Sequence, residues 1–552
     1  MTPRLSPELC AALRETFQQV GYHVDGVPEL LGDEAHAALG RDEPVPARVA
    51  SRSGGRLGTL VRLFLLGDTE PADAVAEALS PVTVEQALAA GLLRPGAQAG
   101  AGHPDDPAGG SGGGTGGETG GGTGGGLAAA LDVRPHGDED GSWWVVSDLD
   151  LGRFRGQPRA LRADHVLGVG QASLTLASAT VRRPVGRLLD LGTGCGIQAL
   201  HAARYAERLV ATDVNPRALA LAEATFALSG VDVELRGGSW LEPVAGERFD
   251  QIVSNPPFVA GPPRVRHTYR DSGLAGDEVA ARLVGALPGL LADGGVAQLL
   301  ACWLHVRGQD WPERVASWLP RGGGVDAWFV QREVADPALY VGTWLRDSGI
   351  DPASPAARHD AEQWLSWFDS HQVEGVGFGF ITLRNTGSAA GRTEPTVLCE
   401  DLRQALADPL GVEAAGWLDR VAWLRAHADD AALLDARLTL APSVVLERAA
   451  QPGENGWQQV LSTVRRLDGP GWRHEVDELA ESLLAGCQGA LPLIELLALL
   501  GYSHDRPVDE LVAASLPAVR ELVRHGVLVP TEWAPTSAPA GAVGAGMARG
   551  RG

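Results

Sequence analysis

The chain contains no lysine, so arginine alone supplies its basic side chains apart from histidine. Its 69 acidic residues outnumber the 46 basic ones, and the formal net charge at pH 7 is −23. This balance argues against a protein that coats nucleic acid by broad phosphate neutralisation. The arginines between Arg264 and Arg270 nevertheless form a local basic cluster in the sequence.

Cysteine and long apolar runs are scarce as well. The five cysteines are widely scattered and no C-x-x-C pair occurs, so the sequence predicts neither a zinc site nor a disulfide framework, and we expect no metal. No apolar run reaches membrane-spanning length, and the N-terminus lacks a basic segment followed by an apolar one. We therefore expect a cytoplasmic protein without a membrane partner.

The length of 552 residues predicts more than one domain. Residues 109–126 are almost entirely glycine, which cannot bury a core and predicts a disordered, flexible insert. Helix–turn–strand patterns near both ends are typical of winged-helix modules. We expect a mostly helical N-terminal region with a little β structure over 1–160, a central domain over 161–385, a mostly helical domain over 390–535 and a disordered tail over 538–552.

The central region alternates strands and helices with short connections. An apolar run ending in Asp190-Leu191 leads into Gly192-Thr193-Gly194-Cys195-Gly196 and then a helical pattern. Glycines in such a turn let the backbone approach a ligand closely, with helix N-terminal N–H groups aimed at it. The next strand ends in Asp213, at the spacing from which an acid reaches the hydroxyls of a ribose. The pattern predicts a doubly wound, parallel α/β sheet with a site at the carboxyl ends of its strands.

A second motif, Ser254-Asn255-Pro256-Pro257-Phe258, follows the apolar strand at 249–253. The prolines fix φ and remove backbone donors, which predicts a stiff turn at the strand tip. The Asn255 side-chain oxygen and the Pro256 carbonyl are two acceptors that suit a planar NH2 group, and Phe258 offers a stacking surface. With both N–H bonds engaged, the nitrogen lone pair points at an electrophile. The alternative is an ordinary proline-rich loop after a buried strand.

Asp190 to Ile197, Asp213 and Asn255 to Phe258, in this order and spacing, resemble class I S-adenosylmethionine-dependent methyltransferases that modify amino groups. The motifs are similar to those of release-factor glutamine methyltransferases (HemK type) and of small-domain ribosomal-RNA guanine-N2 and adenine-N6 methyltransferases. The resemblance implies a Rossmann-like sheet, S-adenosyl-L-methionine as cofactor and N-methyl transfer without a metal. It implies catalytic roles for Asn255, Pro256, Pro257 and Phe258, and cofactor binding by Asp190, Gly192, Thr193, Gly194, Gly196, Asp213, Ser239, Trp240 and Asn255.

The methyl acceptor stays open between a translation-related protein, methylated at glutamine, and a ribosomal-RNA base. Ser239 stands where these families usually carry an acid that binds the adenine amino group. The Pro-Arg-Pro-x-Thr-Glu stretch typical of glutamine methyltransferases is absent, and residues 164–173 resemble the RNA-modifying branch instead. Residues 271–278, by contrast, resemble the release-factor branch.

Two other classes of protein fit parts of the pattern. A nicotinamide-dependent oxidoreductase also has a glycine turn and a distal acid, but G-x-G-x-G in place of G-x-G-x-x-G and the Asn-Pro-Pro-Phe tip count against it. A non-catalytic scaffold that keeps a cofactor fold is the third hypothesis. The intact set of Asp190, Gly192, Gly194, Asp213 and Asn255 counts against loss of function.

Overall fold

The computed structural model divides the chain into two compact units, which are described separately. The first unit contains residues 1–177 and 182–403, and the second contains 178–181 and 404–552. The predicted insert, apart from Gly126, and the predicted tail lie outside the described residues, and the predicted domain boundaries stay predictions. The structure describes residues 3–96, 126–138, 141–149, 162–265, 268–322, 324–347, 353–387, 395–405, 409–454 and 456–533.

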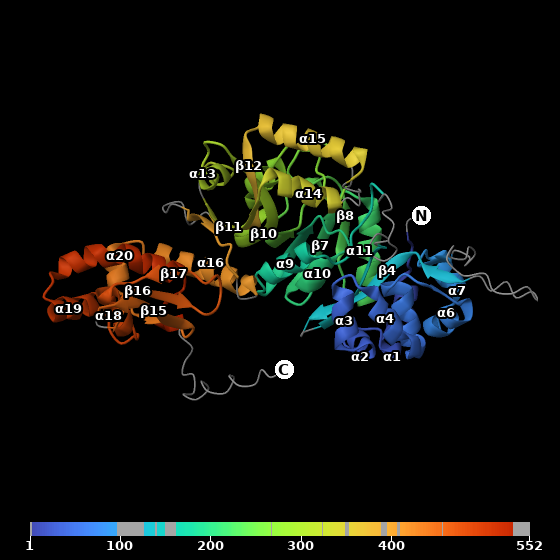
Figure 1. The fold of residues 1–552 in the computed structure, drawn as a ribbon, viewed down its shortest axis with the longest axis horizontal. Helices are drawn as coiled ribbons and strands as arrows, with labels where there is room; N and C mark the ends of the chain where they lie inside the picture. The colour runs from blue at the N-terminus through green and yellow to red at the C-terminus, as the bar shows by residue number, and fades with distance from the viewer. Residues whose placement is uncertain are drawn as a thin grey trace, which may run out of the picture. The chain divides into compact units, whose positions relative to one another are not determined.

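An eight-stranded, mostly parallel sheet forms the centre of the first unit, as predicted (Figure 1). In order across the sheet, its strands are β13 (Val397–Asp401), β11 (Val325–Ala335), β12 (Val373–Asn385), β10 (Leu291–Val306), β9 (Phe249–Ser254), β6 (Val185–Leu191), β7 (Ala206–Asp213) and β8 (Glu234–Gly237). Only β12 runs antiparallel to its neighbours. The strand order reverses between β6 and β9, which is where open α/β sheets form binding crevices.

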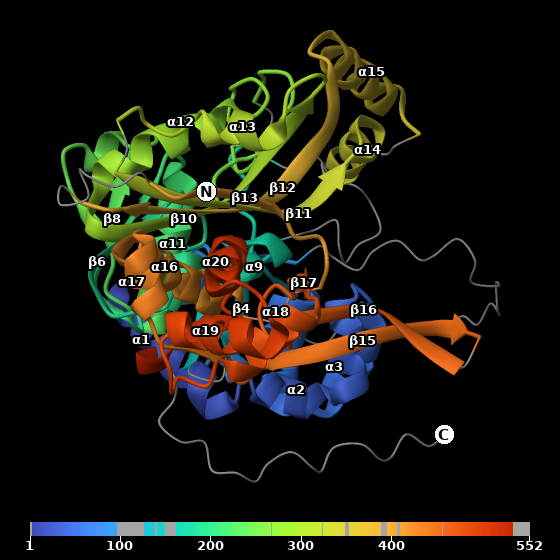
Figure 2. The ribbon, with the colours of Figure 1, turned by 90° about the vertical axis from the view of Figure 1, so that its left-hand side faces the viewer.

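Helices cover both faces of this sheet; Figure 2 shows α12 and α13 on one side and α11 on the other. Leu189 and Val210 pack in the core on the α12 side, whereas Ala211, one residue further along β7, packs in the core that contains α11. This alternation follows from the period of two along a strand. The helices of this part are α9 (Gln171–Ala179), α10 (Ile197–Ala202), α11 (Pro216–Ser229), α12 (Glu278–Ala286), α13 (Trp311–Ala316), α14 (Pro337–Asp347) and α15 (Pro355–Ser370).

The N-terminal part of the first unit is mostly helical, as predicted, and packs on α11 through strand β5. The Val146 N–H donates to Thr225 Oγ1 at 2.9 Å, and Trp144 Nε1 donates to the Tyr22 carbonyl at 2.7 Å. The elements are α1 (Pro7–Val20), α2 (Gly26–Leu31), α3 (Asp33–Gly40), α4 (Pro44–Ala50), α5 (Gly55–Leu60), α6 (Ala72–Leu79) and α7 (Val84–Ala89), a sheet of β1 (Thr69–Glu70), β3 (Leu127–Ala129) and β2 (Leu93–Pro95), and the hairpin β4 (Leu131–Asp138) and β5 (Gly141–Asp148).

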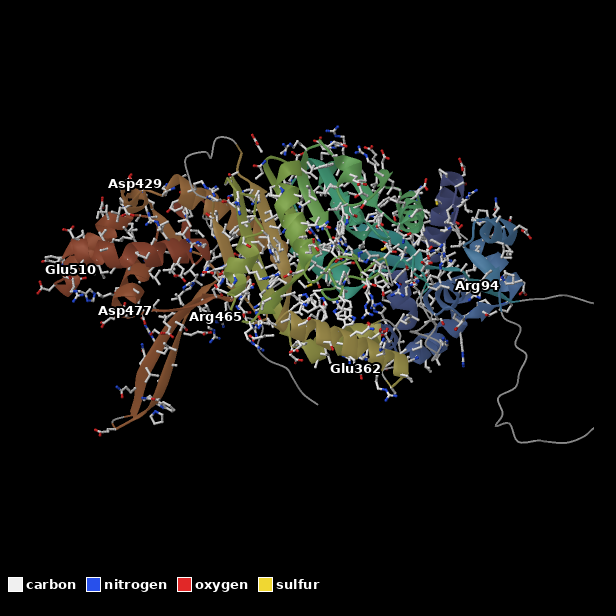
Figure 3. All side chains as sticks on the ribbon, turned by 90° about the horizontal axis from the view of Figure 1, so that it is seen from above. Arg94, Glu362, Asp429, Arg465, Asp477 and Glu510 are labelled. Atoms are coloured by element: carbon white, nitrogen blue, oxygen red, sulfur yellow. The ribbon has the colours of Figure 1, made fainter. Side chains whose placement is uncertain are left out.

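The second unit combines helices with more β structure than the sequence predicted. A long hairpin, β15 to β16, is largely exposed, and Figure 3 shows it extending away from the helices of the same unit. Strand β18 follows α20, as the helix–turn–strand pattern predicts. The elements are α16 (Leu410–Ala426), α17 (Asp430–Asp435), α18 (Glu478–Gly486), α19 (Leu493–His504), α20 (Val508–Arg524), β14 (Leu438–Leu440) paired with β18 (Leu528–Pro530), and β15 (Val444–Gly453), β16 (Gly456–Arg466) and β17 (Arg473–Glu475).

Candidate functional site

A cavity of about 570 Å³ lies at the carboxyl ends of β6, β7 and β9, where the fold places a binding crevice. Its volume is in the range of small-molecule and cofactor sites. Three of the predicted site residues, Asp190, Gly196 and Phe258, are not part of its lining. The predicted residues that do line it are Gly192, Thr193, Gly194, Asp213, Ser239, Trp240, Asn255, Pro256 and Pro257.

The glycine turn after β6 presents bare backbone to the cavity. Gly192 has φ +76° and Gly194 has φ +55°, and a Cβ at either position would meet nothing within 4 Å. A ligand can therefore come close to the backbone at these two positions. Gly196 acts differently, because it precedes α10 with φ +91° and a Cβ there would lie 2.7 Å from the Phe226 ring.

Asp190 supports this turn from behind. Its Oδ2 accepts hydrogen bonds from Thr193 Oγ1 at 2.7 Å and from the Ala199 N–H at 3.1 Å. Its Oδ1 is buried and has no hydrogen-bond partner among the described residues. Burial raises the pKa of Asp190 to about 7, although the two hydrogen bonds oppose that shift. The carboxyl is thus poised to change its charge near neutral pH.

Asp213, the last residue of β7, faces the cavity with a carboxylate that is already oriented. Its Oδ2 accepts the Gly194 N–H at 3.0 Å, and its Oδ1 accepts the Asn215 N–H at 2.8 Å. Burial raises the pKa of Asp213, and these two N–H groups oppose the rise. Each carboxylate oxygen keeps a further lone pair for a donor in the cavity. Two adjacent hydroxyl groups are donors of a suitable kind.

Asn255 stands at the tip of β9 with an unused acceptor. Its Nδ2 donates a long hydrogen bond of 3.4 Å to Ser173 Oγ. Its Oδ1 is buried and has no hydrogen-bond partner among the described residues. An unsatisfied buried acceptor costs free energy until a donor reaches it. Since Asn255, Pro256 and Pro257 all line the cavity, an N–H donor bound there would remove that cost.

The structure places the Phe258 ring outside the cavity lining, away from the stacking position proposed for it. The ring makes edge contacts with Trp344 and Phe378, at centroid distances of 6.2 and 6.5 Å. The Phe258 carbonyl accepts Cys302 Sγ at 2.6 Å, and Tyr340 Oη accepts the Ala260 N–H at 2.7 Å. In this structure the end of the Asn-Pro-Pro-Phe segment therefore anchors the loop.

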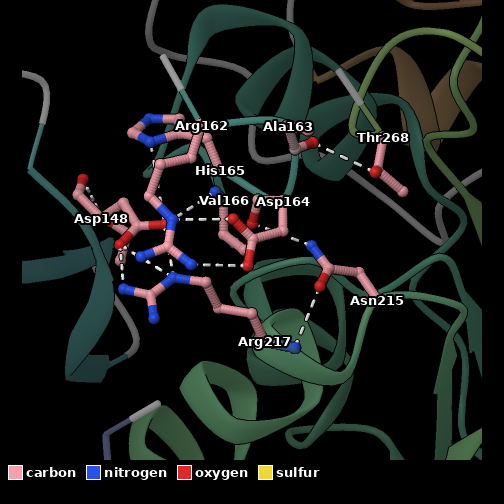
Figure 4. A network of polar contacts seen from close by, with 10 residues as sticks. Asp148, Arg162, Ala163, Asp164, His165, Val166, Asn215, Arg217 and Thr268 are labelled. Carbon is pink, nitrogen blue, oxygen red and sulfur yellow. Dashed lines mark hydrogen bonds and ion pairs between the residues drawn. The ribbon is translucent and has the colours of Figure 1, made fainter. Parts of the chain in front are cut away.

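Another part of the cavity lining comes from Asp148, His165, Val166 and Asn215, and Figure 4 shows the polar contacts around them. Asp148, at the end of β5, accepts the Val166 N–H at 3.0 Å and pairs with the Arg217 guanidinium. Asn215 Nδ2 donates to the Asp164 carbonyl at 3.1 Å. These contacts hold residues 164–166 beside the start of α11. The sequence drew attention to residues 164–173 but gave no signal for the pairing of Asp148 with Arg217, which lies 69 positions further along the chain.

Ser239 and Trp240 form a strained part of the lining. Trp240 has φ +48°, a left-handed conformation that is rare for a bulky residue and is typical of functional sites. Gly238 precedes them with φ +156°, and a Cβ there would lie 2.6 Å from Pro243. The backbone therefore needs glycine at 238 to bring Ser239 and Trp240 to the cavity.

Cys195 lies in the glycine turn but is not set up as a nucleophile. It is buried, and burial raises the pKa of its thiol to about 12. A thiol of that pKa stays protonated at neutral pH, and the thiolate is the reactive form. Packing in the turn accounts for this cysteine.

One family of known proteins matches the part of the chain that contains most of this cavity's lining. Residues 167–271 match the family described as methyltransferase small domain, which bears out the resemblance inferred from the motifs. Residues 19–102 and 415–530 each match a family described only as a domain of unknown function.

Curated relatives of two kinds align with the central region. A release factor glutamine methyltransferase of Bordetella pertussis is 35% identical over 156 residues, which are 26% of this chain and 54% of that protein. The protein of the same name from Deinococcus radiodurans is 40% identical over 124 residues, 20% of this chain and 44% of that one. A ribosomal RNA small subunit methyltransferase C of Salmonella newport is 32% identical over 122 residues, 22% of this chain and 34% of that one. The chain thus spans about half the length of these relatives or less.

Solved structures with partial likeness include a T. thermophilus 16S rRNA N2 G1207 methyltransferase in complex with AdoMet and guanosine, with a TM-score of 0.24 and 18% identity, covering 34% of this chain and 45% of that one. A ribosomal protein L11 methylase of Lactobacillus delbrueckii has a TM-score of 0.19 and 25% identity, covering 24% of this chain and 62% of that one.

Proposed function

We propose that this protein is an S-adenosyl-L-methionine-dependent N-methyltransferase that acts on a planar amino or amide nitrogen of a macromolecule. The observation that carries the proposal is the buried Oδ1 of Asn255, which has no hydrogen-bond partner in the part of the chain that the structure describes and shares its cavity with Asp213 and the glycine turn. The match to the methyltransferase small domain supports the same reaction class.

The residues of the cavity fit the cofactor that this reaction class requires. Gly192 and Gly194 leave open space beside their backbone, and Asp213 has lone pairs available for the two hydroxyls of a ribose. In this proposal Asp190 keeps the turn in shape through Thr193, and Ser239 and Trp240 line the adenine end. When bound, S-adenosyl-L-methionine supplies a methyl group on a positively charged sulfur.

In the proposed mechanism the chain's own groups position the acceptor nitrogen and stabilise its charge. Asn255 Oδ1 accepts one N–H of the acceptor NH2 group, and the Pro256 carbonyl accepts the other. The nitrogen lone pair would then be free to attack the methyl carbon in line, so that the N–C bond forms as the S–C bond breaks and the sulfur leaves as a neutral thioether. The nitrogen would become positive as it gains the methyl group, and the two oxygen dipoles would stabilise that charge until the nitrogen loses a proton to solvent.

The acceptor in this proposal is either a translation-related protein or ribosomal RNA. The relatives are named as methyltransferases of release-factor glutamine and of ribosomal RNA. Both the glutamine side chain and RNA bases carry planar NH2 groups. None of the helices that the structure describes is long and apolar enough to cross a membrane. A cytoplasmic location stays a prediction.

Two measurements test the proposal. Calorimetry with S-adenosyl-L-methionine and with NAD separates it from a nicotinamide-dependent oxidoreductase; binding of NAD alone would contradict it. Incubation with methyl-labelled cofactor and the separated RNA and protein fractions of a cell extract then identifies the acceptor. Cofactor binding without label in either fraction would favour the non-catalytic scaffold.

A further inference from the structure

The second unit brings together three side chains of the kind that bind transition metals. His474 lies on β17, Glu521 lies in the last turn of α20, and His525, four positions further on, directly follows that helix. One ligand atom can be taken from each residue so that all three lie within 4.8 Å of one another. The proposed methyl transfer uses none of these residues.

The two imidazoles already have the spacing of a shared metal ion. His525 Nδ1 and His474 Nε2 form a hydrogen bond of 3.1 Å, which a shared metal ion would replace. Two nitrogens bound tetrahedrally to zinc at its usual bond length lie about 3.3 Å apart. Glu521 Oε1 lies 3.8 Å from the other ring nitrogen of His474, and its side chain is 55% exposed. The Glu521 carboxylate therefore has room to turn toward the two facing nitrogens.

The surroundings hold the histidine rings in place without a metal. The His525 ring is buried and stacks on Trp472, with centroids 4.3 Å apart and planes within 2°. His474 is fixed by its strand, in register with Val464 of β16. Binding a metal would therefore cost little conformational entropy, because these two side chains are already ordered.

The charges around the cluster are compatible with a cation. The C-terminal end of a helix carries a partial negative charge, and His525 directly follows α20. Arg466 and Arg420 donate to the His525 and Arg524 carbonyls, and Arg473, beside His474 on β17, pairs with Glu447. Arg466 and Arg420 both pair with the buried Glu413, which offsets their charge.

We propose that His474 Nε2, His525 Nδ1 and a Glu521 carboxylate oxygen form a Zn²⁺ site, with water completing the tetrahedral shell. Two imidazoles and one carboxylate suit Zn²⁺, whereas Mg²⁺ and Ca²⁺ prefer an all-oxygen shell. The bound ion would tie β17 to the end of α20 and stabilise the second unit. This site is independent of the proposed methyltransferase activity.

The test is calorimetric titration of tag-free, full-length protein, stripped with EDTA, with ZnCl₂ and separately with MgCl₂. We expect saturation at one Zn²⁺ per chain, no comparable binding of Mg²⁺, and a higher melting temperature in Zn²⁺ than in EDTA. Absence of stoichiometric Zn²⁺ binding by the wild-type protein would overturn the proposal.

Substitutions then assign the site. The Glu521 side chain is 55% exposed, so Glu521→Gln should fold like the wild type. Glu521→Gln and His474→Gln should each weaken Zn²⁺ binding about 100-fold or more, since even partners of metal ligands contribute about 10–100-fold. His427→Gln is the matched control, because His427 also follows a helix and stacks on a tryptophan, Trp423, at 3.9 Å. The His427→Gln variant should bind Zn²⁺ with the affinity of the wild type. Unchanged affinity in both Glu521→Gln and His474→Gln would overturn the assignment.

Discussion

At the scale of single residues, the position of Asp213 predicts that its carboxylate contributes to cofactor affinity. Its oriented carboxylate should accept the hydroxyls of a ribose, and hydrogen bonds to a charged acceptor contribute about 1.5–3 kcal/mol. Asp213→Ala should therefore weaken S-adenosyl-L-methionine binding about 10- to 100-fold by calorimetry. Asp164→Ala is the control, because that side chain pairs with Arg162 and does not line the cavity. Equal affinity of Asp213→Ala and wild type would contradict the assignment.

The raised pKa of Asp190 predicts that the stability of the fold depends on pH. Its pKa rises from 3.8 in the unfolded reference to about 7 in the folded chain, so between these values the folded chain holds a proton that the unfolded chain releases. The contribution of this carboxyl to stability is therefore present below pH 3.8 and is lost as pH rises toward 7.

Asparagine at position 190 cannot ionise and removes this dependence. The melting temperature of Asp190→Asn minus that of the wild type should be larger at pH 8 than at pH 5. Thermal unfolding of both proteins, without cofactor and at the two pH values, measures the difference. The same offset at both values would show that Asp190 does not titrate in this range.

The residues of the candidate site differ in how far the sequence predicted their position. Gly192 and Asp213 follow directly from buried strands, so the strand ends determine their place at the cavity. The ring of Phe258 was not predictable in this way, because Trp344 and Phe378 determine its direction and lie far along the chain. For the proposed zinc site, the lack of paired cysteines predicted no metal, whereas Glu521 and His525 come together at the end of α20 and their partner His474 lies on a separate strand.

At the scale of elements, the loop after β9 depends on the hydrogen bond that the Ala260 N–H donates to Tyr340 Oη. Tyr340→Phe leaves this N–H unsatisfied in the interior, which costs about 1–3 kcal/mol and loosens the loop. We expect a lower kcat for methyl transfer with unchanged cofactor affinity. Tyr22→Phe is the matched control, because its buried hydroxyl donates to the Val133 carbonyl and should affect stability only. A similar loss of kcat in both variants would contradict a specific role for the loop.

Elements with strong local signals were predictable and elements without them were not. Helix α11 begins with the N-cap Asn215 followed by Pro216 and ends at Gly230 in a left-handed conformation, as its sequence indicates. The hairpin β15–β16 lacked such a signal, because most of its residues are exposed on both faces and no alternation of apolar and polar residues marks it. Strand β13 is short, and only its pairing with β11 identifies it.

At the scale of the whole molecule, we expect the flanking regions to select the acceptor, because a site at the strand ends gives little surface for recognising a macromolecule. A chain ending at Arg403 keeps β13 in the sheet, whereas an end near residue 390 would remove that strand. The shortened protein should bind S-adenosyl-L-methionine as the full chain does and fail to methylate the macromolecule. Full methylation by the shortened chain would show that residues 404–552 serve another partner.

Deletion of residues 109–126 should leave both cofactor binding and methylation intact. The glycine-rich composition predicts that ordering this segment would cost too much conformational entropy for it to bind a partner. The same two assays measure the effect. A loss of methylation in this variant would show that the glycine-rich segment takes part in function.

The most direct test of the proposed function compares methyl transfer and cofactor binding in Asn255→Ala. Removal of this acceptor should reduce kcat about 10²–10³-fold, the effect of losing one preorganised polar contact in a shielded site, while S-adenosyl-L-methionine affinity stays close to that of wild type. Transfer of labelled methyl to the acceptor, measured beside calorimetry on the same preparation, gives both values. Undiminished turnover in Asn255→Ala would contradict the proposal and leave the segment a proline-rich loop.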